Sequence, residues 1–180
     1  MCRFKSGLIF KNRCVVAEGE NDSHSDLLES LGIEDNTENA MRVFVRVELL
    51  PPNEEWWKDP DTWNENVDQD ILPEWFENDK ERYFDEFRKA VKEWWKEHVR
   101  IDEEIEKLSS GYYRLKRCKV KKMLKDVKAM LDNSTVQDML DNSTVQNMWD
   151  NSIARDNKNK KIKISSECDY EIVKEENKKS

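Results

Sequence analysis

The sequence contains no run of about 18 apolar residues, the length that a membrane-spanning helix needs, so we expect no transmembrane segment and no membrane partner. The apolar stretch near the N-terminus is too short for a signal peptide, and its charges lie in the wrong places. Four glycines and four prolines in 180 residues argue against general disorder. Because the glycines stand singly, a glycine-rich phosphate loop is excluded as well. We therefore expect a folded cytoplasmic protein.

Cysteine and histidine are too scarce to form a recognisable catalytic or metal centre. The four cysteines include no Cys-x-x-Cys pair, and reduced thiols are expected in the cytoplasm. Cys2 could become an N-terminal nucleophile after removal of Met1, but a small buried apolar residue is the simpler interpretation. His24 stands beside Ser23, which fits a helix cap, and His98 ends an aromatic stripe. We predict no enzyme activity, no metal and no cofactor.

Charge is abundant and unevenly divided along the chain. Charged residues outnumber apolar ones, at 39% against 37%, but seven Trp and six Phe concentrate enough apolar area for a core. Residues 1–100 carry 24 acidic and 14 basic side chains, whereas residues 101–180 carry 15 and 17. The two halves are therefore expected to meet different partners.

The first half of the chain predicts an α+β domain with a mixed sheet and an amphipathic helix. Residues 3–10 and 13–17 are rich in Phe, Ile and Val and predict a β-hairpin. Serines and a glycine flank a short helix expected over 26–31. Strict alternation over 41–49 predicts a strand with one apolar and one mixed face. Aromatic residues at spacings of three and four predict a long helix over 80–98.

A domain boundary is expected at Ser109–Gly111, where the pattern changes. Just before it, Ile101–Leu108 has the spacing of a second, charged helix. We assign residues 1–108 to an acidic, tryptophan-rich α+β domain and residues 112–175 to a second, repetitive domain. Residues 176–180 are expected to form a disordered tail.

The second domain contains a nine-residue repeat. Met130–Asp138 is followed at once by the near-identical Met139–Asn147, and Met148–Asp156 is a diverged third copy. Asp-Asn-Ser is turn chemistry, which favours short β arcs stacked Val on Val and Met on Met, as in a β-solenoid, over helical hairpins. Residues 160–173 would cap the open end. Since so few repeats are marginally stable alone, a homodimer through this region is also expected.

The acidic segment over residues 53–79 is the candidate partner-binding surface. Tryptophans among charges are typical interface anchors, and spaced carboxylates can imitate a row of phosphates. The alternatives are a solvated surface and tryptophans that belong to the core. Asp68 and Asp70, which flank Gln69, could also hold a cation, although a solvated rim is the simpler interpretation. The predicted partner-binding residues are Glu54, Glu55, Trp56, Trp57, Asp59, Asp61, Trp63, Asp68 and Asp70.

A basic strip at the start of the repeat region is the candidate nucleic-acid contact. It could bind phosphates without sequence specificity, and the alternative is a solvated face of the solenoid. The predicted residues are Arg114, Lys116, Arg117, Lys119, Lys121, Lys122, Lys125 and Lys128. Arg155, Lys158, Lys160, Lys161 and Lys163 would extend the strip.

Five sequence features together carry a resemblance that covers nearly the whole chain. They are Met1–Gly7, Ser23–Leu28, Phe44–Leu49, Val67–Trp75 and the Asn-Ser-Thr-Val-Gln repeats. In this combination the chain resembles a family of small proteins from Firmicutes genomes and their phages. The family includes a type II-A anti-CRISPR protein, an inhibitor of the RNA-guided effector nuclease. Relatives carry more repeats, so a long solenoid surface is not expected here.

The resemblance implies a non-enzymatic inhibitor in the cytoplasm of a host bacterial cell. Its partner would be a CRISPR effector nuclease or the complex of that nuclease with guide RNA. The acidic segment would occupy a basic groove of the nuclease and block DNA loading or cleavage. The second hypothesis is a nucleic-acid-binding phage accessory protein that contacts DNA through the basic strip.

Overall fold

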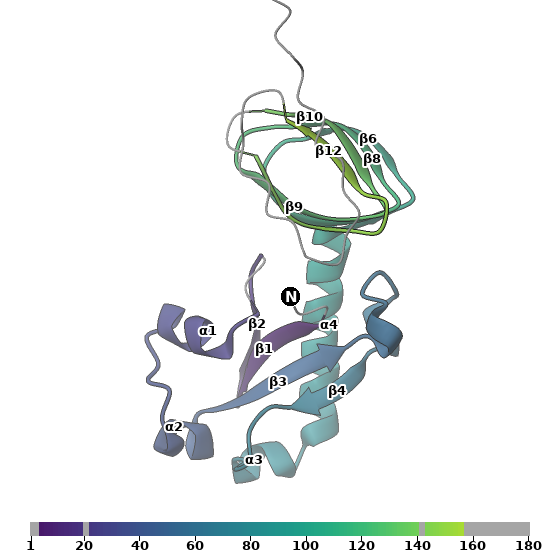
Figure 1. Ribbon diagram of the computed structural model, residues 1–180. Coiled ribbons are helices and arrows are strands. Elements are labelled where there is room, and N and C mark those ends of the chain that lie inside the picture. Colours follow the sequence, from purple (N-terminus) through teal and green to yellow (C-terminus); the bar gives the residue numbers. More distant parts are fainter. Residues whose placement is uncertain (1–3, 20–21, 141–142, 157–180) are drawn as a thin grey trace, which may run out of the picture. The chain divides into compact units, whose positions relative to one another are not determined.

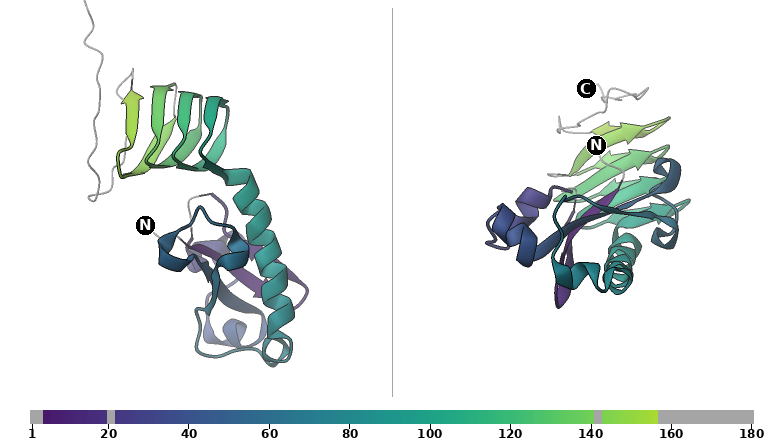
Figure 2. Two further views of the ribbon diagram at one scale, coloured as in Figure 1. Left: turned by 90° about the vertical axis from the view of Figure 1, so that its right-hand side faces the viewer. Right: turned by 90° about the horizontal axis from the view of Figure 1, so that it is seen from below.

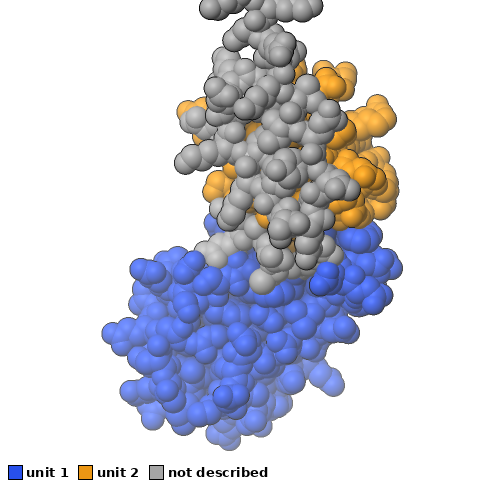
Figure 3. Space-filling view, viewed as in Figure 1, with its two compact units in different colours: residues 1–97 blue, residues 98–180 orange. Residues whose placement is uncertain are grey.

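The computed structural model describes residues 4–19, 22–140 and 143–156 and divides the chain into two compact units, residues 1–97 and 98–180 (Figure 3). The boundary lies before the predicted Ser109–Gly111, because residues 99–108 belong to the second unit as strands. In the described part of the chain, no helix is both long and apolar enough to cross a bilayer. The predicted cap and tail lie outside the described residues, as does Cys2.

The centre of unit 1 is a four-stranded antiparallel sheet in the order β2-β1-β3-β4 (Figure 1). Its strands are β1 (Lys5–Phe10), β2 (Arg13–Val16), β3 (Phe44–Leu50) and β4 (Asn64–Val67). The predicted hairpin is confirmed as β1 and β2. The sheet is wholly antiparallel rather than mixed, since every strand runs opposite to its neighbour.

Within the described residues of unit 1, four helices accompany this sheet, and the long helix predicted over 80–98 is confirmed. The helices are α1 (His24–Ser30), α2 (Thr37–Arg42), α3 (Glu74–Glu77) and α4 (Lys80–His98), with 3-10 turns at Pro52–Glu54 and Pro60–Thr62. The Ser23 hydroxyl caps α1 by accepting a hydrogen bond from the Asp26 N–H. The predicted strand over 41–49 begins only at Phe44, because α2, capped by Asn36, occupies the preceding residues.

Strand β1 is buried on both faces because helices cover the sheet from two sides. On one face, Gly7 lies against α4: a Cβ built there would come within 2.3 Å of Phe87 Cε2. On the other face, Leu8 and Phe10 pack with Leu28 of α1. The apolar side of β3 therefore faces α4, and its mixed side shares the face covered by α1.

Unit 2 is a β-solenoid built from two parallel four-stranded sheets, as predicted (Figure 2). One sheet has the order β11-β9-β7-β5 and the other β12-β10-β8-β6. The strands are β5 (Val99–Ile101), β6 (Glu104–Leu108), β7 (Gly111–Lys116), β8 (Lys119–Met123), β9 (Val127–Asp132), β10 (Thr135–Met139), β11 (Thr144–Trp149) and β12 (Ile153–Asp156). The helix expected over Ile101–Leu108 is wrong, because a left-handed Asp102 separates β5 from β6 there.

The unit that stacks is a full coil of the solenoid, which contains nearly two nonapeptides. The sequence pattern alone suggests instead that each nonapeptide stacks on the next. Val136 pairs with Val120, and Met139 pairs with Met123, each sixteen residues earlier in the chain. This confirms Val on Val and Met on Met within one sheet. The next repeat, however, starts the opposite sheet, where Val145 pairs with Ala129. Consecutive copies therefore face each other across the core instead of stacking.

One corner between the sheets explains the Asp-Asn-Ser motif at residues 132–134. The Asn133 backbone takes a left-handed φ of 48°, which asparagine tolerates better than most residues. Buried Ser134 accepts a hydrogen bond from the Cys118 N–H of the preceding coil at 2.9 Å. Its own N–H donates to the Ser152 hydroxyl of the next coil at 3.2 Å. The serines therefore join successive corners by hydrogen bonds.

Candidate functional site on unit 1 and the charged strip of unit 2

Two tryptophans of the predicted acidic interface belong to the core of unit 1. Trp56 and Trp63 are only 1% and 2% exposed, so they are not surface anchors, which corrects that expectation. The Trp63 indole N–H donates to the Lys58 carbonyl, and the Trp95 indole N–H donates to the Trp56 carbonyl. Trp57 is half-buried and remains accessible to a partner.

Several carboxylates of the acidic segment are paired with cations of the same unit. Glu55 lies 2.7 Å from Lys58. Lys92 pairs with Asp59 at 3.2 Å and also with Asp61. A hydrogen bond from the Asp61 N–H, helped by Lys92, lowers the pKa of Asp59. The charged form of Asp59 is therefore favoured, and Glu54, Asp59 and Asp61 stay exposed.

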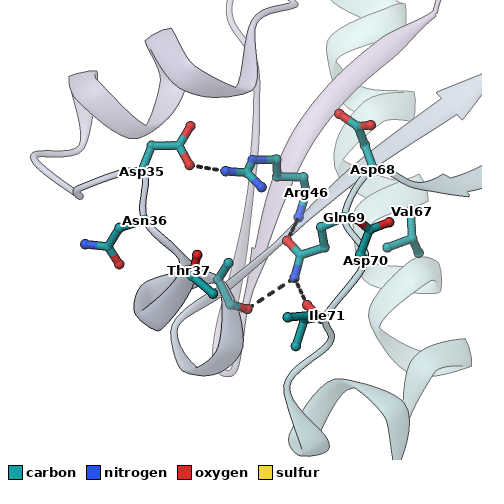
Figure 4. A pocket seen from close by; sticks show the side chains of 10 residues that line it. Asp35, Asn36, Thr37, Arg46, Val67, Asp68, Gln69, Asp70 and Ile71 are labelled. Atoms are coloured by element: carbon teal, nitrogen blue, oxygen red, sulfur yellow. Dashed lines mark hydrogen bonds and ion pairs between the residues drawn. The ribbon is translucent and has the colours of Figure 1, made fainter.

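A polar pocket of about 550 Å³ lies beside β3 (Figure 4). Asp35, Arg46, Asp68, Gln69 and Asp70 are among its lining residues. Arg46 is half-buried and forms an ion pair with Asp35 at the edge of the pocket. A fixed guanidinium among carboxylates gives the pocket both signs of charge, which suits a polar ligand or a charged side chain of a partner.

Gln69 holds the pocket wall together rather than facing a ligand. Its Oε1 accepts from the Arg46 backbone N–H at 2.9 Å, and its Nε2 donates to the Ile71 carbonyl at 2.7 Å. These bonds hold the segment that contains Gln69 against β3. Asp68 and Asp70, the neighbours of Gln69 in the chain and the two carboxylates singled out in the sequence, both line this pocket.

Asp35 and Arg46 were not predicted from the sequence as residues of this site. Arg46 lies on the mixed face of the strand predicted over 41–49. A charged residue on such a face indicates a candidate site, but this face was expected to be directed toward solvent. The Arg46–Asp35 ion pair depends on helix α2, which lies between the two residues in the chain. That helix was not predicted because it has no apolar stripe, so nothing in the sequence pairs Arg46 with Asp35.

His24 is not the cap of α1 but a buried residue, 9% exposed, directed at the sheet. Its Nε2 lies 3.1 Å from the Val47 carbonyl oxygen and its Nδ1 lies 3.2 Å from Asp68 Oδ2. One ligand atom each from His24, Glu48 and Asp68 lies within 4.8 Å of the others. We call these three residues the His24 cluster; their donor atoms could hold a metal ion.

In unit 2, two members of the basic strip are buried and unavailable to phosphates, which corrects the expectation for them. Arg114 is 1% and Lys116 is 8% exposed. Lys116 Nζ lies 2.6 Å from Asp132 Oδ1, so its charge is matched inside the solenoid. The Arg114 side chain donates from Nε to the Tyr112 hydroxyl.

Three further members of the strip are paired with acids of the neighbouring coil. These pairs are Arg117 with Asp102 at 2.6 Å, Lys119 with Glu104 at 3.1 Å and Lys121 with Glu106 at 2.5 Å. Lys122, Lys125 and Lys128 are exposed, and Lys125 lies 3.8 Å from Asp126. Arg155 is exposed, and the proposed extension from Lys158 onward lies outside the described residues. The strip is therefore largely neutralised by its own unit.

The described thiols lack the environment of a nucleophile. Burial raises the pKa of both Cys14 and Cys118, whereas a reactive cysteine needs a lowered pKa. His98 Nδ1 lies 2.8 Å from the Tyr112 carbonyl oxygen, so the backbone helps to fix this ring.

Comparison with known proteins gives no match to this chain among protein-family models, curated proteins or solved structures.

Proposed function

We propose that this chain is a non-enzymatic binding protein whose acidic unit 1 occupies a basic groove on a protein that handles nucleic acid. The unequal charge of the two units carries this proposal. Residues 1–97 have 24 acidic and 13 basic side chains, a net charge of −11. Residues 98–180 have 15 and 18, a net charge of +3, and the described strip there is largely paired internally. The surplus charge available to a partner is therefore negative.

The sequence resemblance supports a more specific form of this proposal. The partner would be the effector nuclease of a type II CRISPR system, and the bound protein would block DNA loading or cleavage. Exposed carboxylates at Glu54, Asp61 and Asp70 would take positions that DNA phosphates otherwise occupy in the groove. Charge complementarity of this kind mainly accelerates encounter.

Trp57 is the residue that we propose as the apolar anchor of the contact. It is half-buried and packs edge-on against buried Trp56, with ring centroids 5.7 Å apart. A large aromatic group held in this way loses little conformational freedom on binding, as hot-spot residues typically do. Replacing Trp57 by Ala should raise the dissociation rate, on the order of tenfold.

The test is a kinetic binding measurement with the purified effector–guide RNA complex on a sensor surface. A variant with Glu54→Gln, Asp61→Asn and Asp70→Asn removes three exposed charges and should slow association by roughly tenfold at low salt. The matched control removes three exposed charges elsewhere in unit 1, by Glu29→Gln, Glu81→Gln and Asp85→Asn. Equal association rates for both variants and the unmodified chain would rule out this contact surface.

Direct DNA binding is separated from this proposal by gel shifts over a salt series. Binding that weakens steeply with salt and depends on Lys122, Lys125 and Lys128 would favour the nucleic-acid-binding alternative. An absence of shift, together with tight binding to the nuclease complex, would support the protein partner.

A further inference from the structure

We propose that the His24 cluster binds a divalent first-row transition metal, with His24 Nδ1 and the carboxylates of Glu48 and Asp68 as its protein ligands. This inference goes beyond the proposed function, because the site lies within unit 1 and needs no partner. It also differs from the sequence expectation of no metal, which rested on the small number of histidines and on their spacing.

The contacts of the imidazole ring are the first argument. Both ring nitrogens of His24 face oxygen atoms, the Val47 carbonyl at 3.1 Å and Asp68 Oδ2 at 3.2 Å. A neutral imidazole carries only one N–H, so it can donate to only one of them. The carbonyl oxygen can only accept, which assigns the proton to Nε2. The Nδ1 lone pair then points at a carboxylate, a repulsive contact unless a metal ion lies between them or the ring carries a second proton.

The outer contacts of the His24 cluster resemble those of metal-binding histidines. Such a histidine usually donates its second N–H to a backbone carbonyl or a carboxylate, which fixes the tautomer and the ring plane. The Val47 carbonyl provides this contact here. Ligating carboxylates are in turn held by hydrogen bonds, and Asn66 Nδ2 donates to Glu48 Oε2 at 2.8 Å.

The backbone fixes the two carboxylates at the position that the ring faces. Glu48 of β3 pairs with Asn66 of β4. The Asp68 N–H donates to the Arg46 carbonyl at 2.9 Å, which continues this pairing two residues further along the chain. Glu48 and Asp68 therefore lie on the same face of the sheet, the face that is covered by α1. A bound ion would connect the first residue of α1 to both strands.

The composition of the cluster selects the class of ion. One imidazole nitrogen and two carboxylates suit Zn²⁺ or Mn²⁺, whereas Mg²⁺ and Ca²⁺ prefer oxygen ligands alone. Two carboxylates leave a net negative charge for the ion to neutralise. The nearby Arg46 guanidinium is directed toward Asp35 and away from Asp68 (Figure 4). Asp68 is 57% exposed, which leaves room for an ion to enter and for water to complete its coordination.

The competing explanation is a simple ion pair between a doubly protonated His24 and Asp68. That arrangement satisfies the same two distances but gives the protein no affinity for a metal. It also gives Glu48 no part in the contact. The two explanations are therefore separated by metal titration and by a Glu48 variant.

The experiment is calorimetric titration of the metal-free full chain with Zn²⁺, Mn²⁺, Mg²⁺ and Ca²⁺, with a phosphine reductant in place of a thiol because thiolates bind Zn²⁺. We expect one equivalent of Zn²⁺ or Mn²⁺ to bind more tightly than Mg²⁺ or Ca²⁺. At about a hundredfold excess over the dissociation constant, the bound ion should raise the unfolding temperature of unit 1 by on the order of 10 °C. No binding of Zn²⁺ or Mn²⁺ at millimolar concentration would overturn the proposal.

Variants test whether the bound metal ion is held by the His24 cluster rather than by cysteine thiols or by His98. Asp68→Asn alters an exposed residue, so the fold should persist while the bound equivalent is lost. Glu48→Gln should have the same effect, and Asn66→Ala should weaken binding by roughly tenfold. Glu29→Gln is the matched control, an exposed carboxylate of α1 outside the cluster, and should bind as the unmodified chain does. Undiminished binding by Asp68→Asn and Glu48→Gln would also overturn the assignment.

Discussion

Lys116 and Asp132 occupy paired positions on adjacent coils, and their side chains form a nearly buried ion pair with Nζ 2.6 Å from Oδ1. Asp150, on the next coil, brings a second carboxylate to 3.7 Å from the same Nζ. Burial raises the pKa of Asp132, as does Asp150, while Lys116 opposes this shift. Lys116 is therefore the cation that permits Asp132 and Asp150, on successive coils, to lie close together.

Replacing Lys116 by Met should destabilise unit 2 strongly at neutral pH, by roughly 3–5 kcal/mol, because a buried carboxylate loses its cation. Replacing both residues, Lys116→Met with Asp132→Leu, should recover most of that loss since no buried charge remains. Urea unfolding followed by circular dichroism measures both free energies of unfolding. A double variant that is less stable than Lys116→Met alone would contradict this account.

The serine corners predict a second effect on stability. Ser134→Ala leaves the buried Cys118 N–H without its acceptor and removes the hydroxyl bonds to the Leu115 and Asp132 carbonyls. We expect a loss of about 2 kcal/mol in the free energy of unfolding. Ser110→Ala, at an exposed position of the same unit, is the control and should change stability by less than about 0.5 kcal/mol. Equal effects of the two changes would show that the corner bonds do not stabilise the coil.

The sequence sufficed for the solenoid because its turn residues carry a local signal. Asn133 takes the left-handed backbone that its side chain tolerates, and Ser134 makes a bond that only a small hydroxyl residue can make there. The direction of stacking was not visible, since Val136 and Val145 occupy the same place in their repeats but lie in opposite sheets. A nine-residue repeat can form a solenoid in two ways: each copy can stack on the next copy in one sheet, or the two copies can lie in opposite sheets and face each other across the core.

Other elements were missed because local periodicity is ambiguous or silent. Ile101, Ile105 and Leu108 are spaced as on one face of a helix. The same spacing arises here because a left-handed turn at Asp102 separates two short strands, with Ile101 in the first and the other two residues in the second. The acidic neighbours of Trp56 suggested an exposed interface, although an indole can turn inward while adjacent carboxylates stay in water. The His24 cluster joins a helix to two strands, and no spacing along the chain encodes that contact.

Close packing of α4 on the sheet gives a further prediction at Gly7. A methyl group there would come within 2.3 Å of Phe87 Cε2 and 2.5 Å of the Val15 carbonyl oxygen. Gly7→Ala should therefore destabilise unit 1 by roughly 2–3 kcal/mol through overpacking. The added change Phe87→Leu should restore only part of this loss, because the backbone oxygen of Val15 stays in place. Thermal unfolding of the three proteins measures the effect, and an unchanged melting temperature for Gly7→Ala would contradict it.

The Asp102–Arg117 pair should be visible in the acid range. Two hydrogen bonds from the guanidinium, each 2.6 Å long, lower the pKa of the Asp102 carboxyl below its ordinary value of 3.8. A carboxyl with a lowered pKa in the folded state stabilises the fold above its unfolded pKa. That stabilisation is lost as the pH falls through the folded value. The contribution of this pair should therefore be constant at neutral pH and disappear only in acid.

Carbon-13 NMR titration of the Asp102 carboxyl checks this expectation directly. Its midpoint should lie below 3.8 in the unmodified chain and move back toward 3.8 in Arg117→Gln, because the amide cannot supply the charged bonds. Asp102→Asn keeps a residue that tolerates the left-handed backbone, so it removes the charge without straining the corner. Because the Asp102→Asn variant has no carboxyl to protonate at this position, its free energy of unfolding should fall less between neutral pH and acid than that of the unmodified chain. A midpoint at or above 3.8 in the unmodified chain would mean that the two hydrogen bonds do not persist in solution.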